Sequence, residues 1–205
     1  MWSLSLITPP AAEPLSVDDG QVKAHLRLDP DLAPQDALLS AAITTARQNC
    51  ETFTGRQLIT ATWELWMESW YEEGICREGV LYLPSPPVTG ITSITYLDSN
   101  DVAQTWAADQ YVTVFPAGPQ ASRAQVFPAY GVVWPTALCQ PASIKIRFTA
   151  GYGAAGTTVP AGLRQGMLLE LGEMYDRREL ATVGTTQSPN FITAERLWWP
   201  FRSFY

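Results

Sequence analysis

The sequence predicts an α+β fold in which helices lie near both ends of the chain and an antiparallel β-sheet region lies between them. Two observations predict it. Apolar residues recur at spacings of three and four in segments near the ends, which is typical of amphipathic helices. Between residues 59 and 149, short runs alternate apolar and polar residues and are separated by turn residues. Because these runs follow one another closely, we expect antiparallel pairing, since parallel pairs need long crossover connections.

Three helices are expected, over about residues 16–28, 35–54 and 160–178. Ser16 is a suitable capping residue for the first helix, and Asp29-Pro30 stops it. The second helix is the clearest, because its apolar stripe is continuous and Gly55 follows as a C-terminal stop; the stripe consists of Leu39, Ile43, Ala46, Cys50 and Phe53. The third helix opens at Pro160 and is followed by a solvated, charged end.

The domain organisation follows from these elements. Residues 1–180 are predicted to form one domain, with a Pro-rich, extended start over residues 1–15. Residues 181–189 are rich in Thr, Ser and Gly without periodicity, which predicts a flexible linker. Residues 190–205 are predicted to form an extended, aromatic C-terminal docking arm.

Composition counts against most classes of enzyme. The 205 residues carry a formal net charge of −7, which disfavours a nonspecific grip on nucleic acid. The chain has one histidine, His25, and three widely spaced cysteines, which fits reduced thiols in a protein made in the cytosol. No apolar run approaches about 18 residues, so no membrane span is expected, and the start of the chain lacks a basic secretory signal. We therefore predict no catalytic residue, metal site or cofactor.

One glycine-rich motif would, if it bound a dinucleotide, contradict the prediction of no cofactor. Residues 151–156 (GYGAAG) match the Gly-x-Gly-x-x-Gly pattern of dinucleotide-binding loops. That chemistry requires the helix N-terminus to meet the last glycine, but residues 157–160 intervene, and the preceding strand belongs to an antiparallel run. A loop without a nucleotide is the favoured interpretation.

The aromatic C-terminal segment is the candidate functional site. Several exposed aromatic side chains would form an aggregation-prone patch, so they must dock somewhere. They either pack back on their own domain or anchor the chain on a partner, with arginines at the rim. The predicted partner-binding residues are Phe191, Arg196, Trp198, Trp199, Phe201, Arg202, Phe204 and Tyr205. Under the docking interpretation, deleting residues 190–205 abolishes complex formation and leaves the melting temperature nearly unchanged, whereas back-packing predicts a large loss of stability.

Two functions of other classes remain open at this stage. Trp63, Trp66 and Trp70 cluster in and after the first alternating run, with Trp63 and Trp66 on opposite faces, and an exposed Trp platform binds sugars or bases. The second alternative is an enzyme that uses a loop thiol, Cys76 or Cys139, as its nucleophile, which requires a depressed thiol pKa.

A series of short motifs, in order along the chain, carries a resemblance to a known family. They are residues 4–11 (LSLITPPA), 23–28 (KAHLRL), 37–43 (ALLSAAI), 54–56 (TGR), 63–65 (WEL), 83–84 (LP) with Pro86-Pro87, 94–96 (ITY), 128–131 (PAYG), 134–135 (WP), 148–153 (FTAGYG) and 159–160 (VP). Their order and spacing over residues 4–180 resemble the head–tail connector, or adaptor, proteins of long-tailed phages and gene transfer agents.

The resemblance implies a structural role in the virion neck. Such proteins form a ring, in the virion most often of twelve copies, under the portal at the capsid–tail junction. The ring extends the DNA channel, receives the next neck or tail protein and joins capsid to tail, and DNA passes through it without sequence-specific binding. Connector C-terminal segments embrace the portal, which agrees with the docking interpretation of residues 190–205. Another neck or tail-completion protein is the alternative within this class.

Overall fold

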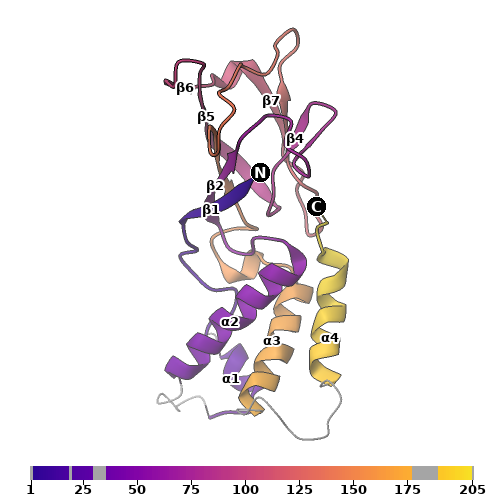
Figure 1. Ribbon diagram of the computed structural model, residues 1–205. Helices are drawn as coiled ribbons and strands as arrows, with labels where there is room; N and C mark the ends of the chain where they lie inside the picture. Colours follow the sequence, from indigo (N-terminus) through magenta and orange to yellow (C-terminus); the bar gives the residue numbers. More distant parts are fainter. Residues whose placement is uncertain (1, 19, 30–35, 177–188, 205) are drawn as a thin grey trace, which may run out of the picture. The chain divides into compact units, whose positions relative to one another are not determined.

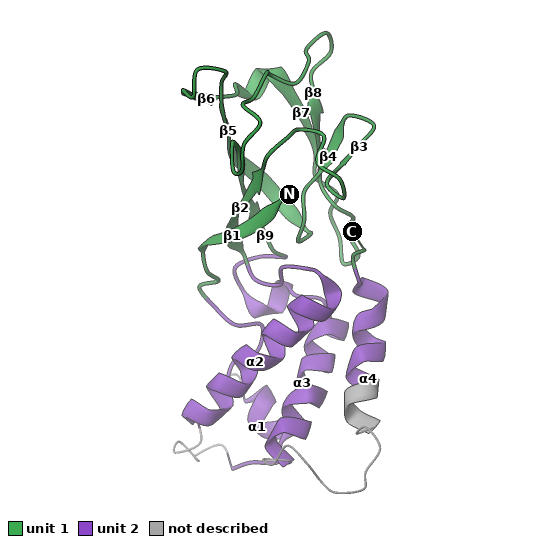
Figure 2. Ribbon diagram, viewed as in Figure 1, with its two compact units in different colours: residues 1–11, 60–151, 203–205 green, residues 12–59, 152–202 purple. Residues whose placement is uncertain are grey.

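The computed structural model of the chain (Figure 1) describes residues 2–18, 20–29, 36–176 and 189–204, and for residues 189–192 it describes the backbone alone. The chain forms two compact units (Figure 2), each built from segments that are distant in sequence. Unit 1 comprises residues 1–11, 60–151 and 203–205, and unit 2 comprises residues 12–59 and 152–202. The strands belong to unit 1 and the α-helices to unit 2, which confirms the predicted α+β class.

Unit 1 contains two sheets in which every pairing is antiparallel, as expected. The five-stranded sheet has the order β1-β2-β9-β5-β6, formed by Ser3–Thr8, Ala61–Met67, Ile144–Ala150, Val88–Leu97 and Ala103–Thr105. The four-stranded sheet has the order β3-β4-β8-β7, formed by Cys76–Arg77, Val80–Tyr82, Gln125–Pro128 and Tyr111–Val114. The central pair β2–β9 keeps an unbroken register, so alternate residues such as Leu65 and Ile146 face the same buried side.

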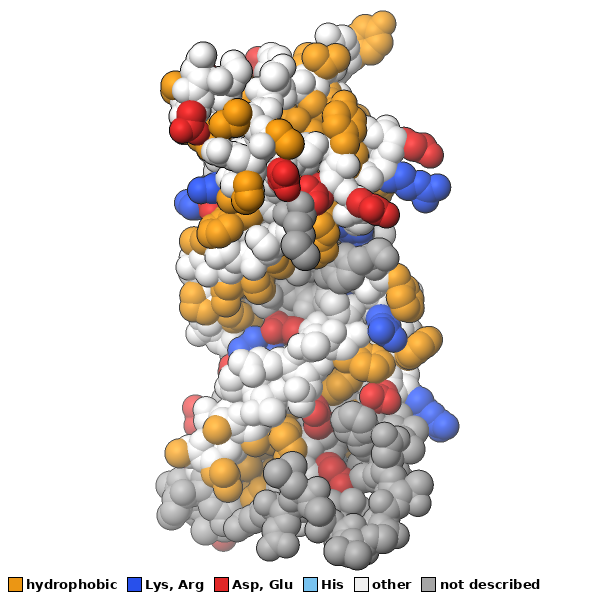
Figure 3. All heavy atoms as spheres, viewed as in Figure 1, with side chains coloured by type: hydrophobic (Ala, Val, Ile, Leu, Met, Phe, Trp, Pro, Cys, Tyr) orange, Lys and Arg blue, Asp and Glu red, His pale blue; other side chains and the backbone are white. Residues whose placement is uncertain are grey.

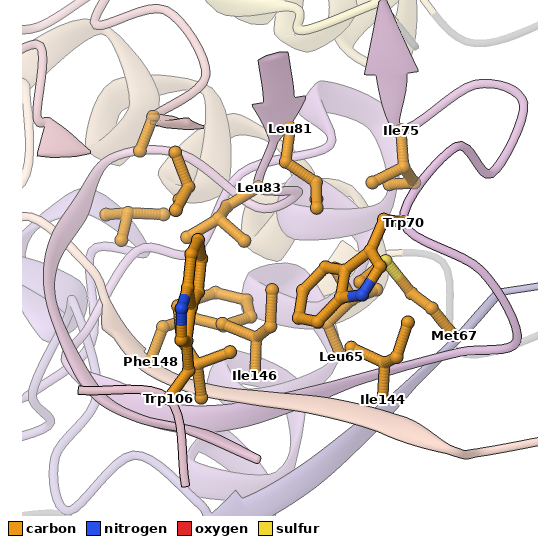
Figure 4. Close-up of a cluster of buried hydrophobic side chains, with 14 of the residues drawn as sticks. Leu65, Met67, Trp70, Ile75, Leu81, Leu83, Trp106, Ile144, Ile146 and Phe148 are labelled. Carbon is orange, nitrogen blue, oxygen red and sulfur yellow. The ribbon is translucent and has the colours of Figure 1, made fainter. Parts of the chain in front are cut away.

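Tryptophans fill the core of unit 1 together with aliphatic side chains (Figure 4). The rings of Trp70 and Trp134 stack with centroids 4.6 Å apart, and Trp106 lies 5.1 Å from Trp134. Buried indole N–H groups need acceptors. Trp70 donates to the Pro135 carbonyl oxygen at 2.8 Å, and Trp134 donates to the Gly79 carbonyl oxygen at 3.2 Å.

Unit 2 is a helical unit. Its helices are α1 (Gln21–His25), α2 (Asp36–Thr54), α3 (Ala161–Asp176) and α4 (Pro189–Trp198), and the short 3₁₀ turn Trp199–Phe201 follows α4. The stripe predicted for the second helix is buried along α2, except that Phe53 is only partly covered. It packs with Leu163, Met167 and Leu171 of α3, which are spaced by four residues as a helix face requires. Among the described residues, no helix combines the length and the apolar character needed to cross a bilayer.

Three elements differ from the expectations. Residues 3–8, within the segment expected to be extended, form the edge strand β1, which was not among the strands expected between residues 59 and 149. The first helix starts only after Gly20, whose φ of 68° is left-handed, and Ser16 instead accepts a hydrogen bond from the Asp18 backbone N–H outside the helix. Residues 189–198 are helical rather than extended, because a four-residue spacing places Ala194 and Trp198 on one buried face.

Candidate partner-binding surface

Trp198 attaches α4 to α3 inside unit 2. Its side chain is only 1% exposed, and its indole N–H donates to the Leu163 carbonyl oxygen at 3.1 Å. The ring fits over Gly166, where a Cβ atom would lie 2.2 Å from the indole nitrogen. The ring also approaches that of Phe53, with centroids 5.9 Å apart. Trp198 is therefore a core residue, as the back-packing interpretation describes.

This packing corrects one expectation about the C-terminal segment. Deleting residues 190–205 would remove Ala194 and Trp198 from the buried core of unit 2. The loss of a buried aromatic side chain costs about 3–5 kcal/mol. The melting temperature of the deleted chain is therefore not expected to stay unchanged, and smaller changes are needed to test partner binding.

The residues around the end of α4 present a different chemistry to solvent. Trp199 is 58% exposed, and Arg196 and Arg202 are exposed beside it in sequence. The Arg202 guanidinium carbon lies 5.4 Å from the ring centroids of both Trp199 and Phe53, so cation–π attraction favours its position beside the two rings. We call Arg196, Trp199 and Arg202 the α4 surface. An exposed Trp flanked by arginines is the composition of an interface hot spot.

The remaining predicted site residues are placed as follows. Phe201 is half-buried against the core of unit 2, and its carbonyl oxygen accepts a hydrogen bond from the Arg56 guanidinium. Phe204 is exposed and belongs to unit 1. Phe191 lies in α4 with only its backbone described, and Tyr205 lies outside the described residues. The predicted linker, residues 181–189, also lies outside them except for Pro189.

Glu170 on α3 is a buried carboxyl with incomplete hydrogen bonding. Glu170 is 5% exposed, and its Oε1 accepts a hydrogen bond from the Asn49 side-chain amide at 2.6 Å. Its buried Oε2 has no hydrogen-bond partner within the part of the chain that the structure describes. Burial raises the pKa of Glu170 above its ordinary value, and the hydrogen bond from Asn49 offsets only part of this. The group is a stability liability in the contact between α2 and α3.

The cysteines do not resemble activated nucleophiles. Burial raises the pKa of Cys76, which is the direction opposite to that required by a reactive thiolate. Burial also raises the pKa of Cys50 well above its usual range, and the Glu51 and Glu170 charges add to this. Cys139 lies in a shallow pocket of about 280 Å³ with its sulfur 3.8 Å from a carboxylate oxygen of Glu68.

The glycine-rich loop has a packing explanation. A Cβ atom on Gly156 would lie 2.4 Å from the Pro14 carbonyl oxygen, so the backbone of residues 13–14 occupies the space beside this glycine. A Cβ atom on Gly153 would lie 2.6 Å from the Thr158 hydroxyl oxygen. The glycines allow close approach of protein groups, which agrees with the interpretation of the loop as one without a nucleotide.

A Trp-faced binding module is not favoured by unit 1. Trp70, Trp106 and Trp134 are buried in its core. On β2, Trp63 packs partly against that core. Trp66 is half-buried, donates to a Glu64 carboxylate oxygen at 2.7 Å and has the Lys145 ammonium 5.4 Å from its ring centroid. In the described residues, no group of three or more His, Cys, Asp or Glu side chains is arranged to hold a metal ion.

Comparison with known proteins gives one consistent answer. Neither a protein-family model nor a curated protein sequence matches the chain. Among solved structures, a chain in the virion of the native gene transfer agent particle matches at 25% identity with a TM-score of 0.74, and the match covers 98% of this chain and 96% of that one. The chain shares its fold with a gene transfer agent virion protein. The resemblance that the sequence motifs predicted is thereby confirmed.

The same fold occurs in two further matches. A chain in the neck of the empty particle, computed with C6 symmetry, has 23% identity and a TM-score of 0.75, and the match covers 99% of this chain and 96% of that one. A chain in the neck of the native particle, computed with C12 symmetry, has 20% identity and a TM-score of 0.71 over the same shares.

Sequence reasoning missed the feature of the fold that distinguishes Trp198 from Trp199. Two adjacent tryptophans after a polar segment look alike in sequence, yet one is buried and the other is exposed. The signal that could have distinguished them is the pair Gly162 and Gly166 on α3, which are four residues apart and hence lie on one helix face. Such a pair creates a notch that receives a large side chain from a neighbouring helix, here Phe201 at Gly162 and Trp198 at Gly166.

Proposed function

We propose that this chain is a structural protein of the virion neck, a head–tail connector that joins the capsid to the tail and extends the DNA channel. The observation that carries the proposal is the match at 25% identity, over 98% of the chain, to a chain of the native gene transfer agent virion. Because the match covers nearly the whole of this chain, it supports the same role for both of its units and not for a shared module alone. The protein would be made in the cytoplasm of the host cell and would act in the particle.

We further infer that the chain works as a ring, of twelve copies in the virion. The symmetries of the two neck structures, C6 and C12, support a cyclic arrangement. In a cyclic ring each subunit uses two different patches, one for each neighbour. A lone subunit therefore leaves both patches open to solvent.

The portal is the proposed partner of the C-terminal segment, and the next neck or tail protein is the partner on the other side of the ring. The α4 surface supports this assignment, because an exposed Trp with two flanking arginines supplies apolar area and hydrogen-bond donors together. Exposed Phe204 is a second anchor from unit 1. Phe191 and Tyr205 complete the proposed set.

The proposed role around a DNA channel also explains the net charge of −7. A ring of acidic subunits around the DNA channel repels the phosphate backbone, so DNA slides through without sequence-specific binding. The acidity is thus a property of the passage and not of a binding site for DNA.

Inactivating the gene in the cells that make the particles tests the proposal. The account predicts filled or leaking heads without tails, and restoration of tailed particles by an intact gene copy. Electron microscopy of purified particles, with immunodetection of the chain, provides both readouts. Tailed particles that retain their DNA in the absence of this chain would contradict the proposal.

A further inference from the structure

The four edge strands of unit 1 differ in how they are guarded against pairing. β3 has two residues, one of which is the exposed Arg77, and β6 is short and follows the acidic turn of residues 98–101. β1 and β7 contain neither a charged residue nor a proline. Edge strands of soluble proteins are normally blunted by charge, proline, a bulge or a covering segment. β1 and β7 are therefore the two edge strands that are longer than three residues and carry neither a charge nor a proline, and we call them the two weakly guarded edges.

β7 also presents apolar side chains to solvent. Val112 and Val114 are 42% and 43% exposed, and their spacing of two places them on one face of the sheet. On the neighbouring strand, partly buried Phe127 is the register partner of Val112. Figure 3 shows exposed apolar side chains in several groups on the visible face of unit 1. Among the described strands, none pairs with the outer edge of β7.

The free edge of β1 matches β7 in length and character. Residues 3–6 pair with β2 in regular register, and the irregularity comes only between Leu6 and Thr8. The regular part is as long as the four-residue β7. Leu6, at its end, is 44% exposed. Two uncharged edges of equal length can form a ladder without burying an unpaired charge.

β1 and β7 lie on opposite flanks of unit 1, as a ring requires. The flank of β1 is that of β3, because the Trp2 indole nitrogen lies 3.7 Å from the Cβ position of Gly74, just before β3. The flank of β7 is that of β6, because the ring of Trp106, just after β6, lies 5.2 Å from the ring of Tyr111. A head-to-tail contact needs two different patches that face away from each other.

We propose that β1 of one copy pairs with β7 of the next copy, so that the sheets of unit 1 continue from subunit to subunit around the ring. This inference rests on the proposed ring function and names its subunit contact. The occupant of each edge is a second copy of this chain, because one copy offers both complementary edges and the neck structures with this fold are cyclic. Backbone hydrogen bonds supply affinity, and the exposed valines pack across the joint.

Cysteine cross-linking in assembled particles tests the contact. In a background with Cys76→Ser and Cys139→Ser, cells would produce particles with the chain carrying Leu6→Cys and Val112→Cys, or Leu6→Cys and Val114→Cys. Mild oxidation is expected to give a ladder of cross-linked multimers for at least one of these pairs. The matched control combines Leu6→Cys with Val133→Cys, a valine that is 80% exposed in a loop, and is expected to give no ladder.

The outcomes separate this inference from the proposed function. If the chain is present in the neck and no ladder forms, or the control forms an equal ladder, the edge contact is wrong and the neck role stands. If the wild-type chain is absent from the particles, both fail.

A second pair of variants tests the edge without cysteines. Val112→Lys adds a charge to the edge of β7, whereas Val112→Thr keeps a β-branched side chain there. We expect Val112→Lys to lower incorporation of the chain into particles by about tenfold and Val112→Thr to lower it little. Both purified variants should melt close to the wild-type temperature, because Val112 lies on the exposed face. Equal incorporation of the Lys variant and the wild type would overturn the proposal.

Discussion

At the scale of single residues, unit 2 depends on glycines of α3 whose missing side chains have different consequences. Gly166 leaves the space that the Trp198 indole fills, whereas Gly172 faces the His25 ring at an ordinary contact distance of 3.6 Å for an added Cβ atom. Glycine in a helix interior costs about 1 kcal/mol relative to alanine. That cost is offset at Gly166 by the burial of Trp198, and at Gly172 no comparable contact offsets it.

Gly166→Ala is predicted to destabilise the protein by about 1–3 kcal/mol, because the new methyl group displaces the indole. Gly172→Ala, on the same helix, is predicted to stabilise it by about 0.5–1 kcal/mol. Thermal unfolding followed by circular dichroism measures both. A Gly166→Ala protein as stable as the wild type would show that Trp198 does not occupy this notch.

Glu170 makes the stability of unit 2 depend on pH. Since burial raises its pKa in the folded state, the ionised carboxyl is destabilising above the folded pKa, and stability increases as the pH falls toward the unfolded pKa. Glu170→Gln keeps an acceptor for Asn49 and removes the charge. We predict that it raises the free energy of unfolding by about 1 kcal/mol at about pH 8 and brings little or no gain at about pH 4. Urea unfolding at the two pH values tests this, and a gain that is equal at both would contradict the assignment.

At the scale of elements, α4 buries one face in the core of unit 2, and we propose that the α4 surface around its C-terminal end binds a partner. Trp198 and Trp199 are adjacent, so a pair of single changes separates the two roles. Trp198→Ala is predicted to cost about 3–5 kcal/mol in stability. Trp199→Ala is predicted to cost about 1 kcal/mol or less and to reduce binding to the cognate portal at least tenfold.

The measurements for this pair are thermal unfolding and co-sedimentation with purified portal. Wild-type portal binding by Trp199→Ala, at unchanged stability, would remove the α4 surface from the proposed interface.

The elements that are predicted best from the sequence are those whose own apolar periodicity determines whether they form a helix or a strand. The apolar stripe of α2, at spacings of three and four, predicts the helix to within a residue, and β9 lies in the region where alternation predicts strands. Prediction was poorer where the local structure depends on contacts with residues that are distant in sequence. Residues 3–8 become a strand because β2 pairs with them, and residues 189–198 become a helix that buries Trp198 in the Gly166 notch. The candidate site follows this division: its aromatic composition was predictable, and its split into buried and exposed members was not.

At the scale of the whole molecule, the two units suggest a division of labour within the proposed neck ring. Unit 1 offers two weakly guarded sheet edges on opposite flanks, suited to contacts between copies. Unit 2 carries the α4 surface, suited to the portal. Neither role needs a cofactor or a deep pocket, and both need many copies in register. The position of the chain in the particle therefore decides whether the proposed function is right.

The most direct measurement is a cryo-electron microscopy reconstruction of the neck in particles made by the cells that encode this chain. The account predicts a ring between portal and tail into which the folds of unit 1 and unit 2 fit, with α4 against the portal. A neck whose density is filled by other proteins, with this chain elsewhere or missing, would contradict it.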